Sequence, residues 1–132
     1  MWEKKKPSYG DQIRVNRGLY SHHGIYVSDD EIIQYASPTG SEVSPDTALI
    51  ISTNLSTFLK GGELEVRVYN NDELKQVKSK EEIVKFARSL LGTGLGEYDI
   101  INNNCEHFSN YCAFGKKVSN QVEDILSMLF GR

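Results

Sequence analysis

The chain has 132 residues, of which 39% are hydrophobic and 25% are charged, as is typical of one soluble globular domain. Its 15 Lys and Arg residues against 18 Asp and Glu residues give a formal net charge of −3, so it has no basic excess with which to bind nucleic acid. It also has no apolar run approaching the ~20 residues that span a bilayer and no signal-peptide core, so we expect a cytoplasmic protein.

The N-terminal half has the pattern of an antiparallel sheet. Alternating apolar residues and β-branched residues predict strands over residues 12–15, 24–27 and 31–36. The sequence S-D-D at residues 28–30 is typical of a hairpin turn between the second and third of these strands. The charged run near the N-terminus predicts a solvated tail, so residues 1–8 are expected to be flexible.

The middle of the chain continues the strand pattern after a loop. Residues 48–52 predict a short apolar strand, and residues 54–60 predict a helical turn that ends at Gly61 and Gly62. Residues 63–69 give the clearest strand, because hydrophobic and charged side chains alternate along it. The hydrophobic positions are Leu64, Val66 and Val68, and the charged ones are Glu63, Glu65 and Arg67. One face of the sheet is therefore expected to be solvated.

From residue 79 onwards the apolar residues recur with a helical period. Ser79 and Glu82 form a capping box, and Gly92 ends the helix that follows. The apolar stripe of this helix consists of Ile83, Phe86, Ala87 and Leu90. A second helix is predicted from Asn104 or Cys105 to Gly115, and a third over residues 119–129.

Strands that come first and helices that follow predict an α+β fold. We expect an antiparallel β-sheet from the N-terminal half to pack against the C-terminal helices, in a single domain over residues 1–132. The apolar stripe of the third helix, within residues 122–129, suits either the core of this domain or a peripheral contact with a membrane.

Both cysteines fall in the second predicted helix. Cys105 and Cys112 are two helical turns apart, about 10 Å at ~1.5 Å per residue, so they cannot form a disulfide with each other and indicate a reducing compartment. Cys105 lies in the first turn, where unpaired N–H groups and the helix dipole stabilise a thiolate and can bind an oxyanion. The alternative is that Cys105 is a small buried side chain, which is our interpretation of Cys112.

A histidine and a glutamine complete a candidate constellation with Cys105. His22 and His23 precede the second predicted strand, and Gln34 lies in the third. Across a short turn His22 and Gln34 fall on the same face, so the amide oxygen can bind one imidazole nitrogen and leave the other as a base. The alternative is a solvated histidine at a strand edge. No metal site is expected, because the sequence has neither C-x-x-C nor H-x₃-H spacing.

Three segments together resemble a known family. They are Y-S-H-H-G-I-Y-V at residues 20–27, E-I-I-Q-Y-A at residues 31–36 and N-C-E-H-F at residues 104–108. This combination resembles the lecithin:retinol acyltransferase family, which includes the H-Ras-like suppressor phospholipase/acyltransferases. The resemblance runs from about residue 10 to about residue 122, and N-C-E-H-F is its most specific element. It implies a circularly permuted NlpC-like, papain-like thiol enzyme fold.

The resemblance also implies roles for individual residues. Cys105 matches the family nucleophile, and His22 matches the base, whereas His23 stands where the family often has tryptophan. Gln34 occupies the third position of the triad, where lipid-acting members commonly have histidine. The residues matching the oxyanion site or structural support are Tyr20, Asn104 and His107, and Tyr20 can equally be a plain hairpin aromatic.

The activity implied by the resemblance is that of a thiol acyltransferase or acyl hydrolase. A Cys105 acyl-enzyme would form on a lipid ester or related acyl substrate, without a cofactor. Two alternatives stay open. One is an NlpC-like cysteine amidase or peptidase, which Gln34 also suits, and the other is a non-catalytic interaction module.

Overall fold

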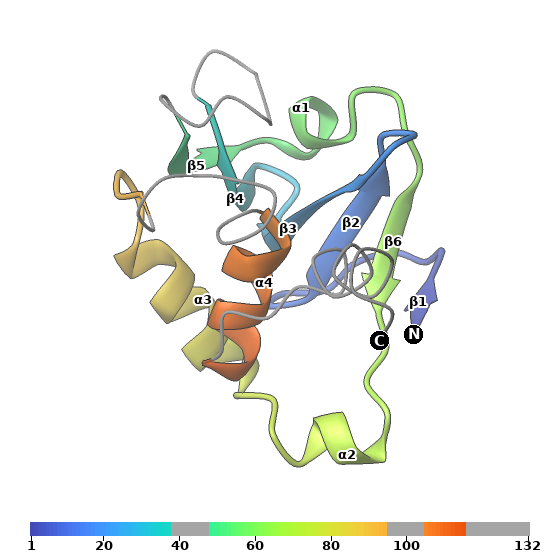
Figure 1. Cartoon of the computed structure of the whole chain (residues 1–132), viewed down its shortest axis with the longest axis vertical. Helices are drawn as coiled ribbons and strands as arrows, with labels where there is room; N and C mark the ends of the chain where they lie inside the picture. Colours follow the sequence, from blue (N-terminus) through green and yellow to red (C-terminus); the bar gives the residue numbers. More distant parts are fainter. Residues whose placement is uncertain (38–47, 95–104, 116–132) are drawn as a thin grey trace, which may run out of the picture.

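The computed structural model describes residues 1–37, 48–94 and 105–115 (Figure 1). Over these residues the fold is α+β, with one six-stranded antiparallel sheet of order β1-β6-β2-β3-β4-β5. The strands are β1 (Trp2–Glu3), β2 (Gln12–Asn16), β3 (Ser21–Ser28), β4 (Glu31–Ala36), β5 (Leu49–Thr53) and β6 (Leu64–Arg67). The helices are α1 (Leu55–Leu59), α2 (Asn71–Leu74), α3 (Lys80–Ser89) and α4 (Cys105–Phe114).

The predicted strands and their antiparallel pairing are confirmed, but two strands differ in length. The strand predicted over residues 63–69 is shorter, since β6 covers only Leu64–Arg67. Strand β3 begins at Ser21 and not at Gly24, because its pairing with β2 continues through His23 and His22 to Ser21. Both histidines are therefore strand residues, and neighbouring side chains of a strand point to opposite faces of the sheet. This parity separates the environments of His22 and His23.

Two elements near the predicted strands were not anticipated. The N-terminus was predicted to be a solvated tail, but Trp2 and Glu3 pair with Arg67 and Val66 of β6 and add an edge strand. Helix α2 is a single turn closed by a capping box between Asn70 and Glu73.

The prediction that one face of the sheet is solvated is wrong. Helices α3 and α4 lie side by side against one face (Figure 1), which we call the helix face. Its buried core comprises Ile25, Val27, Ile33, Tyr35, Ala48, Ile50, Ile83, Val84, Ala87, Phe108, Cys112 and Ala113. The charged side of β6 belongs to this face, and Arg67 is accordingly enclosed by α4 and α2 rather than by water.

The opposite face, which we call the base face, is covered by α1. Its buried core comprises Ile13, Val15, Tyr26, Ile32, Phe58 and Val66. Asn54 caps α1 by accepting a hydrogen bond from the Thr57 N–H, and Lys60 ends the helix in the left-handed conformation. The predicted helical turn over residues 54–60 is thus confirmed, and it places Phe58 in the core.

The predicted amphipathic helix corresponds to α3, with Ser79 as its N-cap and Gly92 in the left-handed region just beyond its end. Helix α4 begins at Cys105 and ends before Gly115, also as predicted. The predicted third helix over residues 119–129 lies outside the described residues. No helix among the described residues is long and apolar enough to cross a membrane.

Candidate active site

The structure brings His22 and Gln34 together on the base face. Gln34 pairs with Gly24 across the β3–β4 hairpin, so His22 is its diagonal neighbour. The Nε2 atom of His22 lies 2.5 Å from Oε1 of Gln34, and both side chains are buried. An amide oxygen only accepts, so the neutral ring donates from Nε2 and keeps its lone pair on Nδ1. The predicted contact between these two residues is confirmed.

Two further residues support this pair from the β5–α1 segment. Nε2 of Gln34 donates a hydrogen bond of 2.5 Å to Oγ1 of Thr53. The ring of Phe58 lies against the imidazole of His22, with centroids 5.1 Å apart. Phe58 approaches this closely because Gly24 has no side chain, since a Cβ there would lie 2.9 Å from Cε1 of Phe58. Neither Thr53 nor Phe58 belongs to a motif that sequence analysis could have identified.

Cys105 is the first residue of α4 and lies at the beginning of β3. Its Sγ atom is 3.7 Å from the carbonyl oxygen of Ser21, the residue that precedes His22. The thiol is buried, and its position at the helix N-terminus is the one that stabilises a thiolate. The structure thus brings the predicted nucleophile to the strand that carries the predicted base.

Buried hydrogen bonds hold α4 on the helix face of the sheet. The side-chain amide of Gln12 donates to Ser109 at 2.8 Å and to Asn110 at 2.9 Å, and Tyr69 donates its hydroxyl to Gln12 at 2.8 Å. Since α4 begins with Cys105, these bonds from β2 also determine where the thiol lies.

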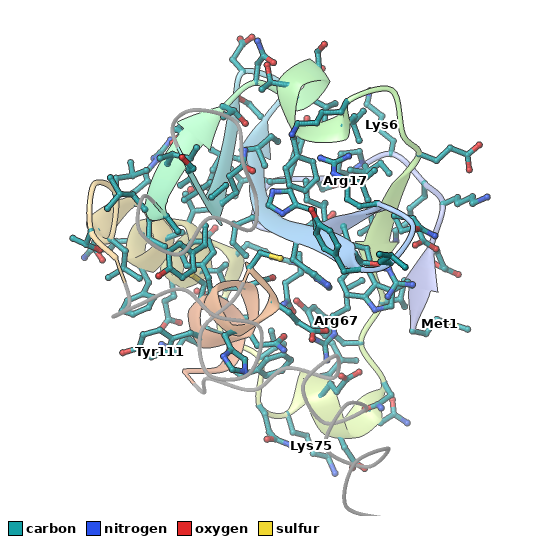
Figure 2. All side chains as sticks on the ribbon, turned by 45° about the horizontal axis from the view of Figure 1, so that its top comes forward. Met1, Lys6, Arg17, Arg67, Lys75 and Tyr111 are labelled. Carbon is teal, nitrogen blue, oxygen red and sulfur yellow. The ribbon has the colours of Figure 1, made fainter. Side chains whose placement is uncertain are left out.

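Arg67 adds a charged contact to the hydrogen bonds that hold α4 on the sheet. Its guanidinium donates to Oδ1 of Asn110 at 2.7 Å and forms an ion pair with Glu73 of α2. In Figure 2 the labelled Arg67 lies between β6, α2 and α4. This role was not predicted, because the alternation along residues 63–69 placed Arg67 on the face expected to be solvated.

His23 points to the helix face, away from Gln34. Its ring packs edge-on against Trp2 at 5.4 Å, and its Nε2 is 3.8 Å from Oε2 of Glu106, which is too far for a hydrogen bond. Burial lowers the pKa of His23 to about 3, and the neighbouring His22 and the charges of Arg14 and Arg67 act in the same direction. His23 is therefore neutral at physiological pH despite the nearby carboxylate.

The second cysteine has a different environment from the first. Cys112 lies in the core of the helix face, and burial raises its pKa to about 12. Neither cysteine forms a disulfide, as predicted. A thiol with this pKa is almost entirely protonated at neutral pH, so Cys112 is unsuited to nucleophilic chemistry.

The remaining predicted site residues are Tyr20, His107 and Asn104. Tyr20 is partly buried at the end of the β2–β3 hairpin, where its carbonyl accepts a 2.8 Å bond from the Arg17 N–H. His107 is buried in the first turn of α4, and Asn104 lies outside the described residues. Among the described residues, no group of three or more potential ligands could hold a metal ion.

Comparisons with known proteins identify relatives over most of the chain. A family model described as "Lecithin retinol acyltransferase" matches residues 5–118. Phospholipase A and acyltransferase 2 of Homo sapiens is 32% identical over 129 residues, which cover 90% of this chain and 78% of that protein. Protein LEAD-SENSITIVE 1 of Arabidopsis thaliana is 31% identical, covering 71% of this chain and 51% of that protein. Lecithin retinol acyltransferase of Rattus norvegicus is 26% identical, covering 86% and 57% respectively. The chain therefore belongs to the lecithin retinol acyltransferase family.

Proposed function

We propose that this member of the lecithin retinol acyltransferase family is a cysteine-dependent acyltransferase or acyl hydrolase of the phospholipase type, acting on lipid esters. The names of its relatives support an enzyme of the acyltransferase or phospholipase type. One observation supports the mechanism most directly, namely that β3 links the nucleophile to the base. Sγ of Cys105 lies 3.7 Å from the carbonyl oxygen of Ser21, and the adjacent His22 is hydrogen-bonded to Gln34.

The acylation step uses His22 first as a base and then as an acid. Nδ1 of His22 takes the thiol proton, and the sulfur of Cys105 attacks the ester carbonyl to form a C–S bond. When the C–O bond breaks, His22 returns the proton to the departing alkoxide. Gln34 stabilises the protonated ring through Nε2 and keeps it in place. The N–H groups at the start of α4 are oriented to bind the oxyanion, with Tyr20 as a further donor.

The acyl-enzyme is then resolved by a second nucleophile. Water gives a free carboxylate and therefore hydrolase activity, whereas an alcohol or amine gives acyl transfer. In both cases His22 takes a proton from the incoming nucleophile and returns it to the thiolate. A lipid substrate also requires contact with a membrane surface or a lipid aggregate.

The order of the elements supports a circularly permuted NlpC-like, papain-like fold. The strand that carries the base, β3, precedes the helix that carries the nucleophile, α4. The family match over residues 5–118 supports a single domain across the chain.

A cysteine amidase or peptidase is the second candidate, and Gln34 is the observation that favours it. Gln34 stands where lipid-acting members commonly have histidine, and a neutral amide suits a thiol enzyme that cleaves amides. A non-catalytic module gains less support, because an interaction surface does not require a buried His22–Gln34 pair on the strand that Cys105 contacts.

Intact-mass spectrometry after incubation with a phospholipid or an N-acyl peptide distinguishes these candidates. The proposal predicts an added fatty acyl mass with phospholipid, present in Cys112→Ala and absent in Cys105→Ala. An adduct only with the peptide donor would favour the amidase. A lack of adduct and of product release with every donor would contradict an enzymatic function.

A further inference from the structure

We propose that Thr53 is a positioning residue of this site, which holds the Gln34 amide with its oxygen toward His22. The proposal rests on the proposed function, because it assigns a means of keeping His22 in the tautomer that a base requires. In the proposed mechanism Thr53 touches neither the thiol nor the reacting atoms, and it acts only through Gln34.

A glutamine in the third position poses a problem that an acid does not. The two ends of its amide have nearly the same size but opposite hydrogen-bonding character, one accepting and the other donating. If the amide were reversed, its NH₂ group would face Nε2 of His22 and would favour the proton on Nδ1. The lone pair needed to take the thiol proton would then be on the wrong nitrogen. The side chain therefore needs a second partner that distinguishes its two ends.

The geometry around Gln34 provides that partner. Oε1 lies 2.5 Å from the His22 ring, and Nε2 lies 2.5 Å from Oγ1 of Thr53, so each end of the amide has its own partner. Gln34 is only 4% exposed, so its amide relies on protein partners for its hydrogen bonds. Thr53 is Cα partner to Ile32 and so lies on the same face as Gln34, two residue pairs away along the β4–β5 ladder.

The protonated form of His22 makes this orientation necessary. An imidazolium carries an N–H on both nitrogens, so a reversed amide would place two donors against each other at Nε2. Only the orientation with oxygen toward His22 stabilises the proton during catalysis, and in that orientation the NH₂ group needs an acceptor of its own. Thr53 is the residue that accepts from it.

Thr53 also belongs to the segment that packs on the other side of the ring. It directly precedes Asn54, the N-cap of α1, and α1 places Phe58 against His22. One short segment, residues 53–58, therefore supports both the hydrogen-bonded edge and one face of the imidazole. A change at Thr53 that spares α1 should affect only the hydrogen-bonded edge.

The test compares Thr53→Val with Thr53→Ser. Valine keeps the shape and β-propensity but removes the acceptor, whereas serine restores it. ¹⁵N NMR of the histidine side chains, recorded above their pKa values, reports the tautomer of His22, with His23 as the internal reference. We expect the parent and Thr53→Ser to show His22 protonated on Nε2, and Thr53→Val to show an increased share of the Nδ1-protonated form.

Activity provides an independent second measurement. We expect Thr53→Val to lower kcat by about tenfold with KM nearly unchanged, and Thr53→Ser to restore it. In a Gln34→Ala background, Thr53→Val should have less than about a twofold further effect, because no amide remains to be oriented.

The outcomes separate this proposal from the function on which it rests. An unchanged His22 tautomer in folded Thr53→Val overturns the role of Thr53, whatever the activity. Equal losses with and without Gln34 also overturn it, since they show an effect that does not act through the amide. A tautomer change as expected, in a protein that forms no acyl adduct with any donor, supports the role of Thr53 and contradicts the proposed function.

Discussion

His22 and His23 are neighbours in one strand, yet they occupy different chemical environments. On the base face, the ring of His22 is hydrogen-bonded to Gln34 and packs against the ring of Phe58. On the helix face, His23 lies beside Trp2 and Glu106, and its pKa is lowered to about 3.

The difference shows that strand parity selects the base. The two residues have the same side chain and nearly the same burial, at 0% and 1% exposure, so neither residue type nor accessibility distinguishes them. Only His22 meets an oriented hydrogen-bond acceptor on the face that Gln34 shares. A shift of one residue in the β3 register would exchange the two roles.

The strongest test of this comparison replaces each histidine in turn. His22→Ala should lower turnover by on the order of a thousandfold, because the general base and the proton donor are lost together. His23→Gln should retain most of the activity, since His23 does not face Gln34. Steady-state kinetics on the acyl donor, with circular dichroism to verify folding, measures both. The reverse pattern would mean that His23 is the base.

The second test concerns Gln34, the hydrogen-bond partner that His22 has and His23 lacks. Gln34→Ala should lower turnover by between about ten and a thousandfold, because a neutral hydrogen bond orients the ring but stabilises an imidazolium less than a charged group would. Gln34→His should retain activity if the position only orients His22. The melting temperature serves as the control. Full activity in Gln34→Ala would reduce the site to a Cys105–His22 dyad.

The two cysteines allow a similar comparison along α4. Burial raises the pKa of Cys112 to about 12, so its thiolate is scarce at pH 7.5, whereas Cys105 lies at the helix N-terminus. We expect iodoacetamide to modify Cys105 at least tenfold faster than Cys112, as followed by peptide mass spectrometry. Denatured protein, in which both thiols are exposed, gives the reference ratio. Faster labelling of Cys112 in the folded protein would contradict the choice of nucleophile.

Local patterns were sufficient to predict the elements that carry the site. Alternation predicted the strands, capping residues and glycines bounded α3 and α4, and the same-face relation of His22 and Gln34 followed from a short turn. These features depend on residues close together in the sequence. The family resemblance linked them to Cys105, which is distant from His22 and Gln34 in the sequence.

The remaining features depend on contacts between distant segments. Strand β1 is only two residues long, and its pairing partner β6 lies in the middle of the chain. The enclosed position of Arg67 depends on α4 packing over a face whose alternation looked solvent-exposed. Thr53 ends an unremarkable strand, and only the folded sheet brings its hydroxyl to Gln34. Sequence periodicity carries no information about such pairings.

The smallest expected effect concerns the pH dependence of stability and returns to His23. Its pKa is about 3 in the folded protein, against 6.5 for an ordinary histidine. Between these values the unfolded chain binds a proton that the folded chain does not, so acidification below pH 6.5 should lower the free energy of unfolding. The contribution of His23 has a limit of about 1.4 kcal/mol per pH unit.

His23→Gln removes this titration and serves as the matched variant. Urea unfolding at pH 7 and pH 4.5 should show the parent losing about 2 kcal/mol more than His23→Gln over that interval. If Glu106, at 3.8 Å, instead kept His23 protonated in the fold, the pKa of His23 would be raised and acidification toward pH 6.5 would stabilise the parent relative to the variant. The sign of the difference therefore decides whether burial or the Glu106 carboxylate determines the pKa of His23. It also decides whether His22 and His23 differ in charge as well as in the face of the sheet to which they point.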